Sequence, residues 1–190
     1  MTTPPPTDPP PVQLYTASAA DAPAITALVN RAYRGDSGRR GWTTEADLID
    51  GTRISTATLH GLLADKDCTI LAGKSGEQLV ACMELRRKDR QLYVGMLTVD
   101  PELQGRRIGS LFMDAAEAHA RQLGLDSLVM MVISVRHELI AWYQRRGFRA
   151  TGETRAFGFA DASFGKPRRP LEFSVLEKRL DGDAGRAPAA

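Results

Sequence analysis

Apolar residues recur at two spacings along the chain, and each spacing predicts one kind of element. A return every three or four residues gives a helix one apolar face, whereas alternation or a short β-branched run is typical of a strand. The helical spacing predicts helices at residues 21–33, 55–64, 107–123 and 137–146. Strands are expected at residues 12–17, 69–73, 79–86, 91–99, 128–134, 148–155 and 171–177. A further short helix is expected after Thr44, because Thr44 and Asp47 have the spacing of a capping box.

The order of these elements predicts a mixed α/β sheet flanked by helices in a single domain, over residues 12–180. Three consecutive strands between residues 69 and 99 are joined by short turns and should pair antiparallel. Residues 1–11 are expected to be a disordered tail, since residues 4–11 hold six of the eleven prolines and little that could be buried. Residues 181–190 are expected to be a second, flexible tail.

Charge and composition exclude several classes of protein. The chain has 190 residues and a formal net charge of only +2, which argues against a dedicated nucleic-acid binder. It has no apolar run near the roughly 18 residues that a membrane span needs. Cys68 and Cys82 are too few for a disulfide framework, so a reducing cytoplasm is the expected location. The histidines His60, His119 and His137 are scattered, and no metal site is expected.

The segment Leu97–Leu111 (LTVDPELQGRRIGSL) carries the clearest chemical signal. A strand ends at Val99, Asp100-Pro101 interrupts it, and a polar loop leads into an amphipathic helix. The backbone N–H groups of Gly105–Gly109 would then gather at a helix N-terminus, where they suit an anion such as a pyrophosphate. The same pattern also fits an ordinary strand–turn–helix connection with solvated arginines.

Two motifs in this chain resemble those of the GNAT superfamily of N-acetyltransferases. Gln104-Gly105-Arg106-Arg107-Ile108-Gly109 is similar to the acetyl-CoA motif Gln/Arg-x-x-Gly-x-Gly/Ala, with Arg107 where the middle glycine usually stands. An arginine in a helical conformation would still present its amide there. About 40 residues later, residues 141–148 (AWYQRRGF) resemble the family signature A-x-Y-x-x-x-G-F. The asparagine that the family often has seven residues before the tyrosine is Arg136 here.

The resemblance implies a GNAT-type fold, with a mostly antiparallel central sheet, and acetyl-CoA as co-substrate without a metal. It implies direct transfer of the acetyl group to a primary amine of a small molecule, an amino acid or a peptide. Splayed strands would leave backbone groups near Met96 free for the pantetheine arm, and the following turn would bind the phosphates. The residues expected to bind acetyl-CoA are Leu97, Thr98, Val99, Gln104, Gly105, Arg106, Arg107, Ile108, Gly109 and Ser110.

Tyr143 is the candidate general acid, because a phenol can donate a proton to a departing thiolate. Without the motif, Tyr143 would be interpreted as a core aromatic residue. Glu84 is the candidate base, with Glu45 or a water chain as rivals; Glu84 also fits a solvent-facing strand position. The acceptor should bind near residues 35–53, where Trp42 and Glu45 are the candidate contacts and Thr43 and Arg53 are further possibilities.

Other functions stay open at this point. One is a non-catalytic module that binds or senses acyl-CoA, against which the intact Tyr143 argues. Another is an interaction module that uses the proline-rich tail and the basic cluster at residues 166–170, although this cluster fits a solvated loop better. No nucleic-acid or membrane partner is expected, and an exposed strand or helix face would suit a homodimer.

Overall fold

The computed structural model describes residues 11–35, 44–157 and 165–180. Its main sheet has seven strands in the order β1-β3-β4-β5-β6-β9-β7, and a separate pair joins β2 to β8. The strands are β1 (Val12–Thr16), β2 (Ile49–Asp50), β3 (Cys68–Ser75), β4 (Gln78–Lys88), β5 (Gln91–Val99), β6 (Ser127–Ile133), β7 (Arg149–Ala156), β8 (Lys166–Pro167) and β9 (Glu172–Arg179). All neighbours in the main sheet are antiparallel except β5 and β6, which are parallel. The mostly antiparallel α/β sheet expected from the sequence is therefore confirmed.

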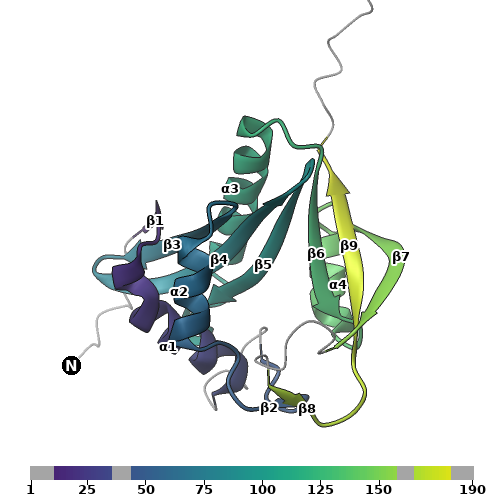
Figure 1. The fold of residues 1–190 in the computed structure, drawn as a ribbon, viewed down its shortest axis with the longest axis horizontal. Coiled ribbons are helices and arrows are strands. Elements are labelled where there is room, and N and C mark those ends of the chain that lie inside the picture. The colour runs from purple at the N-terminus through teal and green to yellow at the C-terminus, as the bar shows by residue number, and fades with distance from the viewer. Residues whose placement is uncertain (1–10, 36–43, 158–164, 181–190) are drawn as a thin grey trace, which may run out of the picture.

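Helices cover both faces of this sheet (Figure 1). The α-helices are α1 (Ala22–Arg34), α2 (Thr56–Ala64), α3 (Ile108–Gln122) and α4 (His137–Gln144), and short 3-10 helices lie at Ala19–Asp21 and Pro101–Leu103. On one face, α1 and α2 bury Ile25, Leu28 and Leu59 against Ile70 and Cys82 of the sheet. On the other face, α3 and α4 enclose a larger core that includes Phe112, Met113, Leu128, Tyr143 and Phe148.

The short helix expected after Thr44 does not form. The backbone N–H groups of Leu48 and Ile49 both donate to the Glu45 carbonyl, at 2.9 and 3.0 Å, and the chain then enters strand β2. Ile49 is buried with Ile133 and Leu171, so its packing against a distant part of the chain outweighs the local capping signal. Part of the basic cluster at residues 166–170 also differs from the solvated loop that was expected, because Lys166 and Pro167 form β8 and Arg168 pairs with Asp50.

The two halves of the sheet separate in the middle, and this positions the site. Strand β5 pairs with β6 only over a short stretch, where Gln91–Tyr93 lie beside Ser127–Val129. Beyond Tyr93 the strands diverge, with β1-β3-β4-β5 on one side and β6-β9-β7 on the other (Figure 1). The stretches of β5 and β6 that no longer pair with each other border the space between the halves.

Candidate active site

A β-bulge in β5 lies beside the point where the halves diverge. Between the pairs Cys82–Thr98 and Glu84–Gly95, strand β5 holds one residue more than β4. Met96 takes up the extra residue with a φ of 50°, a left-handed conformation that is uncommon for a residue with a side chain. The bulge reverses the alternation of side chains: Val94 packs with the α3 core, whereas Met96 packs with the α1 core. Leu97 and Val99 consequently face the side of α3 and α4.

A cavity of about 260 Å³ lies between the end of β5, the start of α3 and α4. We call it the turn cavity. Its lining residues are Tyr33, Leu97, Val99, Gln104, Gly105, Arg107, Ile108, Gly109, Ser110, Leu139, Trp142 and Tyr143. Eight of the ten residues predicted to bind acetyl-CoA are among them. The other two are Thr98, which is buried and donates a hydrogen bond to the Met96 carbonyl, and Arg106, which is exposed.

The N-terminus of α3 presents backbone N–H groups to the turn cavity. The Leu111 N–H donates to the Arg107 carbonyl, so the amides of Ile108, Gly109 and Ser110 precede the first backbone bond of the helix. Arg107, the N-cap residue, makes no capping bond with its side chain. Gly105 has a φ of 82°, which suits glycine, and its α-carbon faces open space. These donors and the positive end of the helix dipole make a site for an anion.

Arg107 is not in the helical conformation expected from the sequence. Its φ of 62° is left-handed, at the position where the family motif has its middle glycine. The arginine adopts the backbone shape that the glycine would provide, at a conformational cost of about 1–2 kcal/mol.

Two aromatic side chains, Trp142 and Tyr143, line one side of the turn cavity, and Arg146 packs on Trp142. The Arg146 guanidinium carbon lies 4.1 Å from the centre of the Trp142 ring, and the same guanidinium donates a hydrogen bond to Ser110 Oγ. Trp142 meets Tyr143 edge to face, with the ring centres 4.9 Å apart. Ser110 directly follows the first motif, in the first turn of α3, and Trp142, Tyr143 and Arg146 belong to the second motif, the first two on α4 and Arg146 just after it. These contacts therefore join the two motif regions.

A second cavity, of about 140 Å³, is lined by residues of both β5 and β6, the two strands that diverge. We call it the arginine cavity. Its lining residues are Tyr33, Arg34, Glu45, Arg53, Tyr93, Val94, Gly95, Met96, Leu97, Met130, Met131, Val132, Ile133, Arg136, Leu139, Tyr143, Phe157 and Phe173. Arg34 and Glu45 form an ion pair of 2.5 Å with side chains only 8% and 12% exposed. Arg53 stacks its guanidinium on the Tyr33 ring, 5.3 Å from the ring centre.

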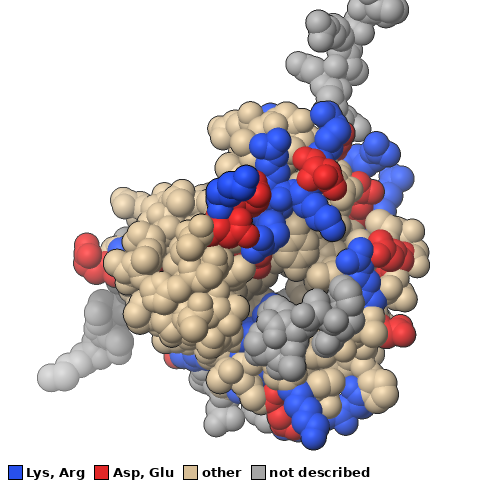
Figure 2. Space-filling model, viewed as in Figure 1, with Lys and Arg blue, Asp and Glu red and all other residues tan. Residues whose placement is uncertain are grey.

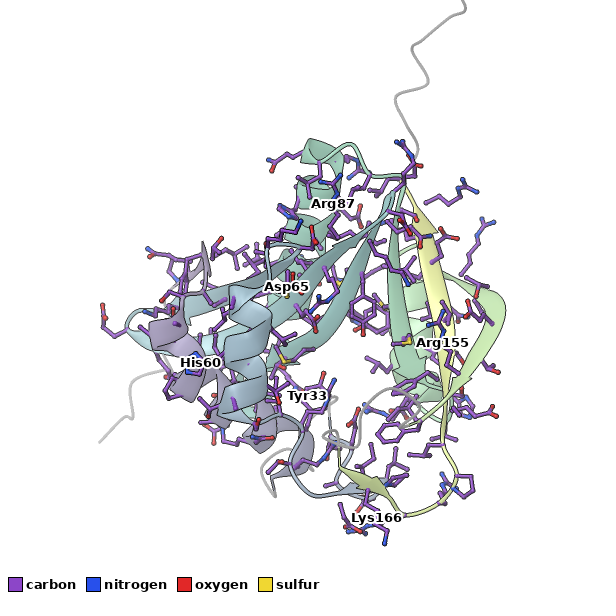
Figure 3. All side chains as sticks on the ribbon, in the orientation of Figure 1. Tyr33, His60, Asp65, Arg87, Arg155 and Lys166 are labelled. Atoms are coloured by element: carbon purple, nitrogen blue, oxygen red, sulfur yellow. The ribbon has the colours of Figure 1, made fainter. Side chains whose placement is uncertain are left out.

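The two cavities share a wall made of Tyr33, Leu97, Leu139 and Tyr143. Tyr33 projects from the end of α1 toward the space between the halves (Figure 3) and donates a hydrogen bond of 3.1 Å to the Leu97 carbonyl. Burial raises the pKa of Tyr33 and of Tyr93 to about 12. Burial also raises the pKa of Tyr143 well above its ordinary value. All these phenols are therefore protonated at neutral pH, and each can act as a proton donor.

The predicted acceptor residues lie in different places. Glu45 lines the arginine cavity, as does Arg53. Glu84 lines neither cavity; its carboxylate accepts a hydrogen bond of 3.2 Å from Arg86 Nε. Trp42 and Thr43 lie outside the described residues, as do the two terminal tails apart from Pro11.

Sequence reasoning missed several residues of the shared wall and the arginine cavity, among them Tyr33, Arg34, Tyr93 and Leu139. Arg136 stood out only as a departure from the family pattern. No local signal marks these residues, because they reach the site from the end of α1, from β5 and from the start of α4. Asn30 was also missed: its Oδ1 accepts bonds from the N–H groups of Arg53 and Ile54, and its Nδ2 donates to the Ile54 carbonyl.

Within the described residues, no group of three or more His, Cys, Asp or Glu side chains could hold a metal ion. No helix among them is long and apolar enough to cross a membrane.

The chain belongs to the GNAT family of acetyltransferases, because the model of the Acetyltransferase (GNAT) family matches residues 24–148. This confirms the resemblance seen in the two motifs. Among curated proteins, the mycothiol acetyltransferase of Propionibacterium freudenreichii subsp. shermanii is 32% identical over 91 residues. That match spans 48% of this chain but only 28% of the relative.

Solved structures share the fold at low sequence identity. An N-acetyltransferase from Staphylococcus aureus Mu50 has a TM-score of 0.70 and 16% identity, with 90% of this chain and 99% of that chain covered. The PaiA N-acetyltransferase of Thermoplasma acidophilum, solved with coenzyme A, has a TM-score of 0.66 and 15% identity over 90% of this chain and 99% of that chain. The yncA protein of Salmonella typhimurium, solved with acetyl-CoA as its cofactor, has a TM-score of 0.64 and 21% identity over 94% of this chain and 98% of that chain.

Proposed function

We propose that this protein transfers an acetyl group from acetyl-CoA to a primary amine of a small molecule, an amino acid or a peptide. The observation that carries the proposal is the position of Tyr143, whose side chain lies in the wall between the two cavities. A reaction between two bound molecules needs one site for each, with a proton donor where they meet.

The features of the turn cavity support it as the site for the phosphate-bearing part of acetyl-CoA. Its helix N-terminus offers backbone donors, and Arg107 adds a positive charge for the phosphates. The predicted contacts from Leu97 to Val99 and from Gln104 to Ser110 would hold the coenzyme. The co-substrate supplies the acetyl thioester. The complexes of the Thermoplasma and Salmonella proteins with CoA or acetyl-CoA support this assignment.

Tyr143 and one of two carboxylates would then transfer the protons of the reaction. Tyr143 is the proposed acid: it keeps its proton at neutral pH and can give it to the sulfur as the thiolate leaves. Glu84 and Glu45 are the two carboxylates predicted as base. Glu45 lines the arginine cavity, which supports it as the carboxylate that contacts the acceptor, while Glu84 would need to act through water.

The same proposal covers partners and location. The partner is the amine substrate, neither nucleic acid nor membrane is required, and the cytoplasm is the proposed compartment. Both cysteines are free and buried. A homodimer stays a prediction from the sequence.

The test combines binding with turnover. A ligand at 100 times its dissociation constant stabilises a protein by roughly 2.7 kcal/mol, so CoA and acetyl-CoA should raise the melting temperature measurably. Thiol release from acetyl-CoA is then followed with a library of amines. Binding with release for at least one amine supports the proposal. Binding without release for any amine would identify the alternative, a non-catalytic acyl-CoA sensor.

A further inference from the structure

The charges around the arginine cavity are unequal. Among the described residues of its lining, three are arginines, Arg34, Arg53 and Arg136, and one is a carboxylate, Glu45. They come from separate places: the end of α1, the segment after β2, the start of α4 and the turn before β2. Positive charge therefore exceeds negative charge in a cavity whose other described walls are largely apolar or aromatic.

Three of these charged side chains, Arg53, Arg136 and Glu45, act electrostatically on Tyr33 in the shared wall. Arg53 and Arg136 both lower the pKa of Tyr33, and Glu45 raises it, although burial is the largest cause and the net pKa is about 12. Arg136 also lowers the pKa of Tyr143, and Arg53 that of Tyr93. Since Coulomb interactions fall off with distance, the two guanidinium groups and the carboxylate surround the same wall that carries the proposed acid.

The fold holds Arg53 in place through its backbone. Asn30 Oδ1 accepts the Arg53 N–H at 2.7 Å and the Ile54 N–H at 3.2 Å, and Asn30 Nδ2 donates to the Ile54 carbonyl at 2.8 Å. These three bonds fix the backbone at Arg53 and Ile54. The position of Arg53 at the cavity therefore does not depend on contacts of its own side chain. On the opposite side, the Arg136 N–H donates to the Ile133 carbonyl at 2.8 Å, just before α4 begins.

We propose that the acceptor is an amine that carries a carboxylate close to it, that is, a free amino acid, bound by Arg53 and Arg136 through its carboxylate and by Glu45 through its ammonium group. This inference rests on the function proposed above. A guanidinium matches a carboxylate with two parallel donors and can bind more than one partner at once. Arg34 holds the Glu45 carboxylate in place through their 2.5 Å ion pair.

The size of the cavity agrees with a small acceptor. Its volume of about 140 Å³ lies well below the roughly 300–1,000 Å³ of sites for drug-sized ligands. A long polycation such as spermidine would bring further positive charges to a lining with three arginines. Figure 2 shows the surface hollowed between the two halves of the molecule, with Lys and Arg interspersed with Asp and Glu along the upper border of the hollow.

The experiment compares amines that differ only in the carboxylate. Thiol release is measured with free amino acids, with their amides, with dipeptides that move the carboxylate one residue away, and with spermidine. We expect the amino acids to exceed their amides in kcat/KM by about 10–100-fold, the effect of losing a charge-assisted contact. Amidation also lowers the pKa of the amine, so a larger fraction of the amide is uncharged and reactive at neutral pH. A preference for the acid would therefore reflect recognition of the carboxylate.

Variants then assign the preference to residues. Arg53→Gln and Arg136→Gln should each lower the ratio of acid to amide turnover by about tenfold or more, mainly through KM, and Arg53→Lys should retain part of it. Arg149→Gln is the matched control, since Arg149 is exposed on β7 and lines neither cavity; it should leave the ratio unchanged.

The outcomes separate this inference from the function on which it rests. Equal or better turnover of amides, dipeptides or spermidine overturns the amino-acid acceptor and leaves acetyl transfer intact. If no amine releases thiol, acetyl transfer fails, and binding of amino acids to the CoA-saturated protein is measured by saturation-transfer NMR. Binding of the acids over the amides, weakened by Arg136→Gln, would still support the carboxylate site; absence of such binding overturns it.

Discussion

The turn cavity and the arginine cavity share four residues but are built in different ways. The turn cavity draws much of its lining from one continuous segment, Gln104–Ser110, and offers backbone N–H groups at the start of α3. The arginine cavity combines two strand stretches, Tyr93–Leu97 of β5 and Met130–Ile133 of β6, with side chains from α1, α4, β9 and the segments between elements. A coenzyme that is the same in every member of a family can be bound by backbone, whereas an acceptor that differs between members needs side chains that can change.

The largest effect is expected at the wall common to both cavities. Tyr143→Phe keeps the ring and its edge-to-face contacts with Trp142 and Phe148 but removes the proton. Turnover should fall by about 10²–10⁴-fold, the usual contribution of a general acid. The affinity for acetyl-CoA and the melting temperature should hardly change. Turnover within about threefold of the parent would make Tyr143 a packing residue.

A change confined to the turn cavity should affect the coenzyme alone. A Cβ at Gly109 would meet Trp142 at an ordinary 3.5 Å, so Gly109→Val is accommodated but places methyl groups in the cavity. Calorimetry should show CoA binding weakened by about tenfold or more, which corresponds to roughly 1.4 kcal/mol. Gly61→Val is the control, because a Cβ there meets nothing within 4 Å and Gly61 lines neither cavity. Equal CoA affinity in the two variants would show that the coenzyme does not bind at this turn.

A change behind the arginine cavity should affect the acceptor alone. Asn30→Ala removes three hydrogen bonds to Arg53 and Ile54. The free energy of unfolding should fall by about 1–3 kcal/mol, because buried partners lose their bonds. The KM for the acceptor should rise while the affinity for CoA stays the same. Asn30→Asp, which keeps the Oδ1 acceptor for two of the three bonds, should lie between the parent and the alanine variant.

The smallest effect is expected at Arg107, where backbone strain can be measured separately from charge. Arg107→Gly and Arg107→Ala both remove the guanidinium, but only glycine relieves the left-handed φ of 62°. Chemical denaturation should find the glycine variant more stable than the alanine variant by about 1 kcal/mol. If the alanine variant is the more stable, the turn does not require a left-handed conformation at residue 107.

The comparison of the two cavities also explains what the sequence could predict. The helices α1 to α4 and the seven strands of the main sheet were expected within a few residues, because each has a periodic pattern of its own. The turn of residues 104–110 was predictable for the same reason, since its signal is local. The wrong helix after Thr44 and the missed pair β2–β8 depend on Ile49 packing against Ile133 and Leu171, which lie far away in sequence. Tyr33 and Tyr93 escaped notice, and Arg136 was noted only as a departure from the family motif, because only the folded chain brings the three together.

The shared wall also bears on the order of the proposed reaction. Its nucleophilic side chains are the phenols of Tyr33 and Tyr143, and burial raises the pKa of both, so they stay protonated and poorly nucleophilic at neutral pH. The wall therefore favours the proposed direct transfer from coenzyme to acceptor over a covalent acetyl intermediate. Direct transfer requires both molecules to be bound together, so initial-rate plots at several fixed concentrations of one substrate should give intersecting lines, and neither half-reaction should proceed alone.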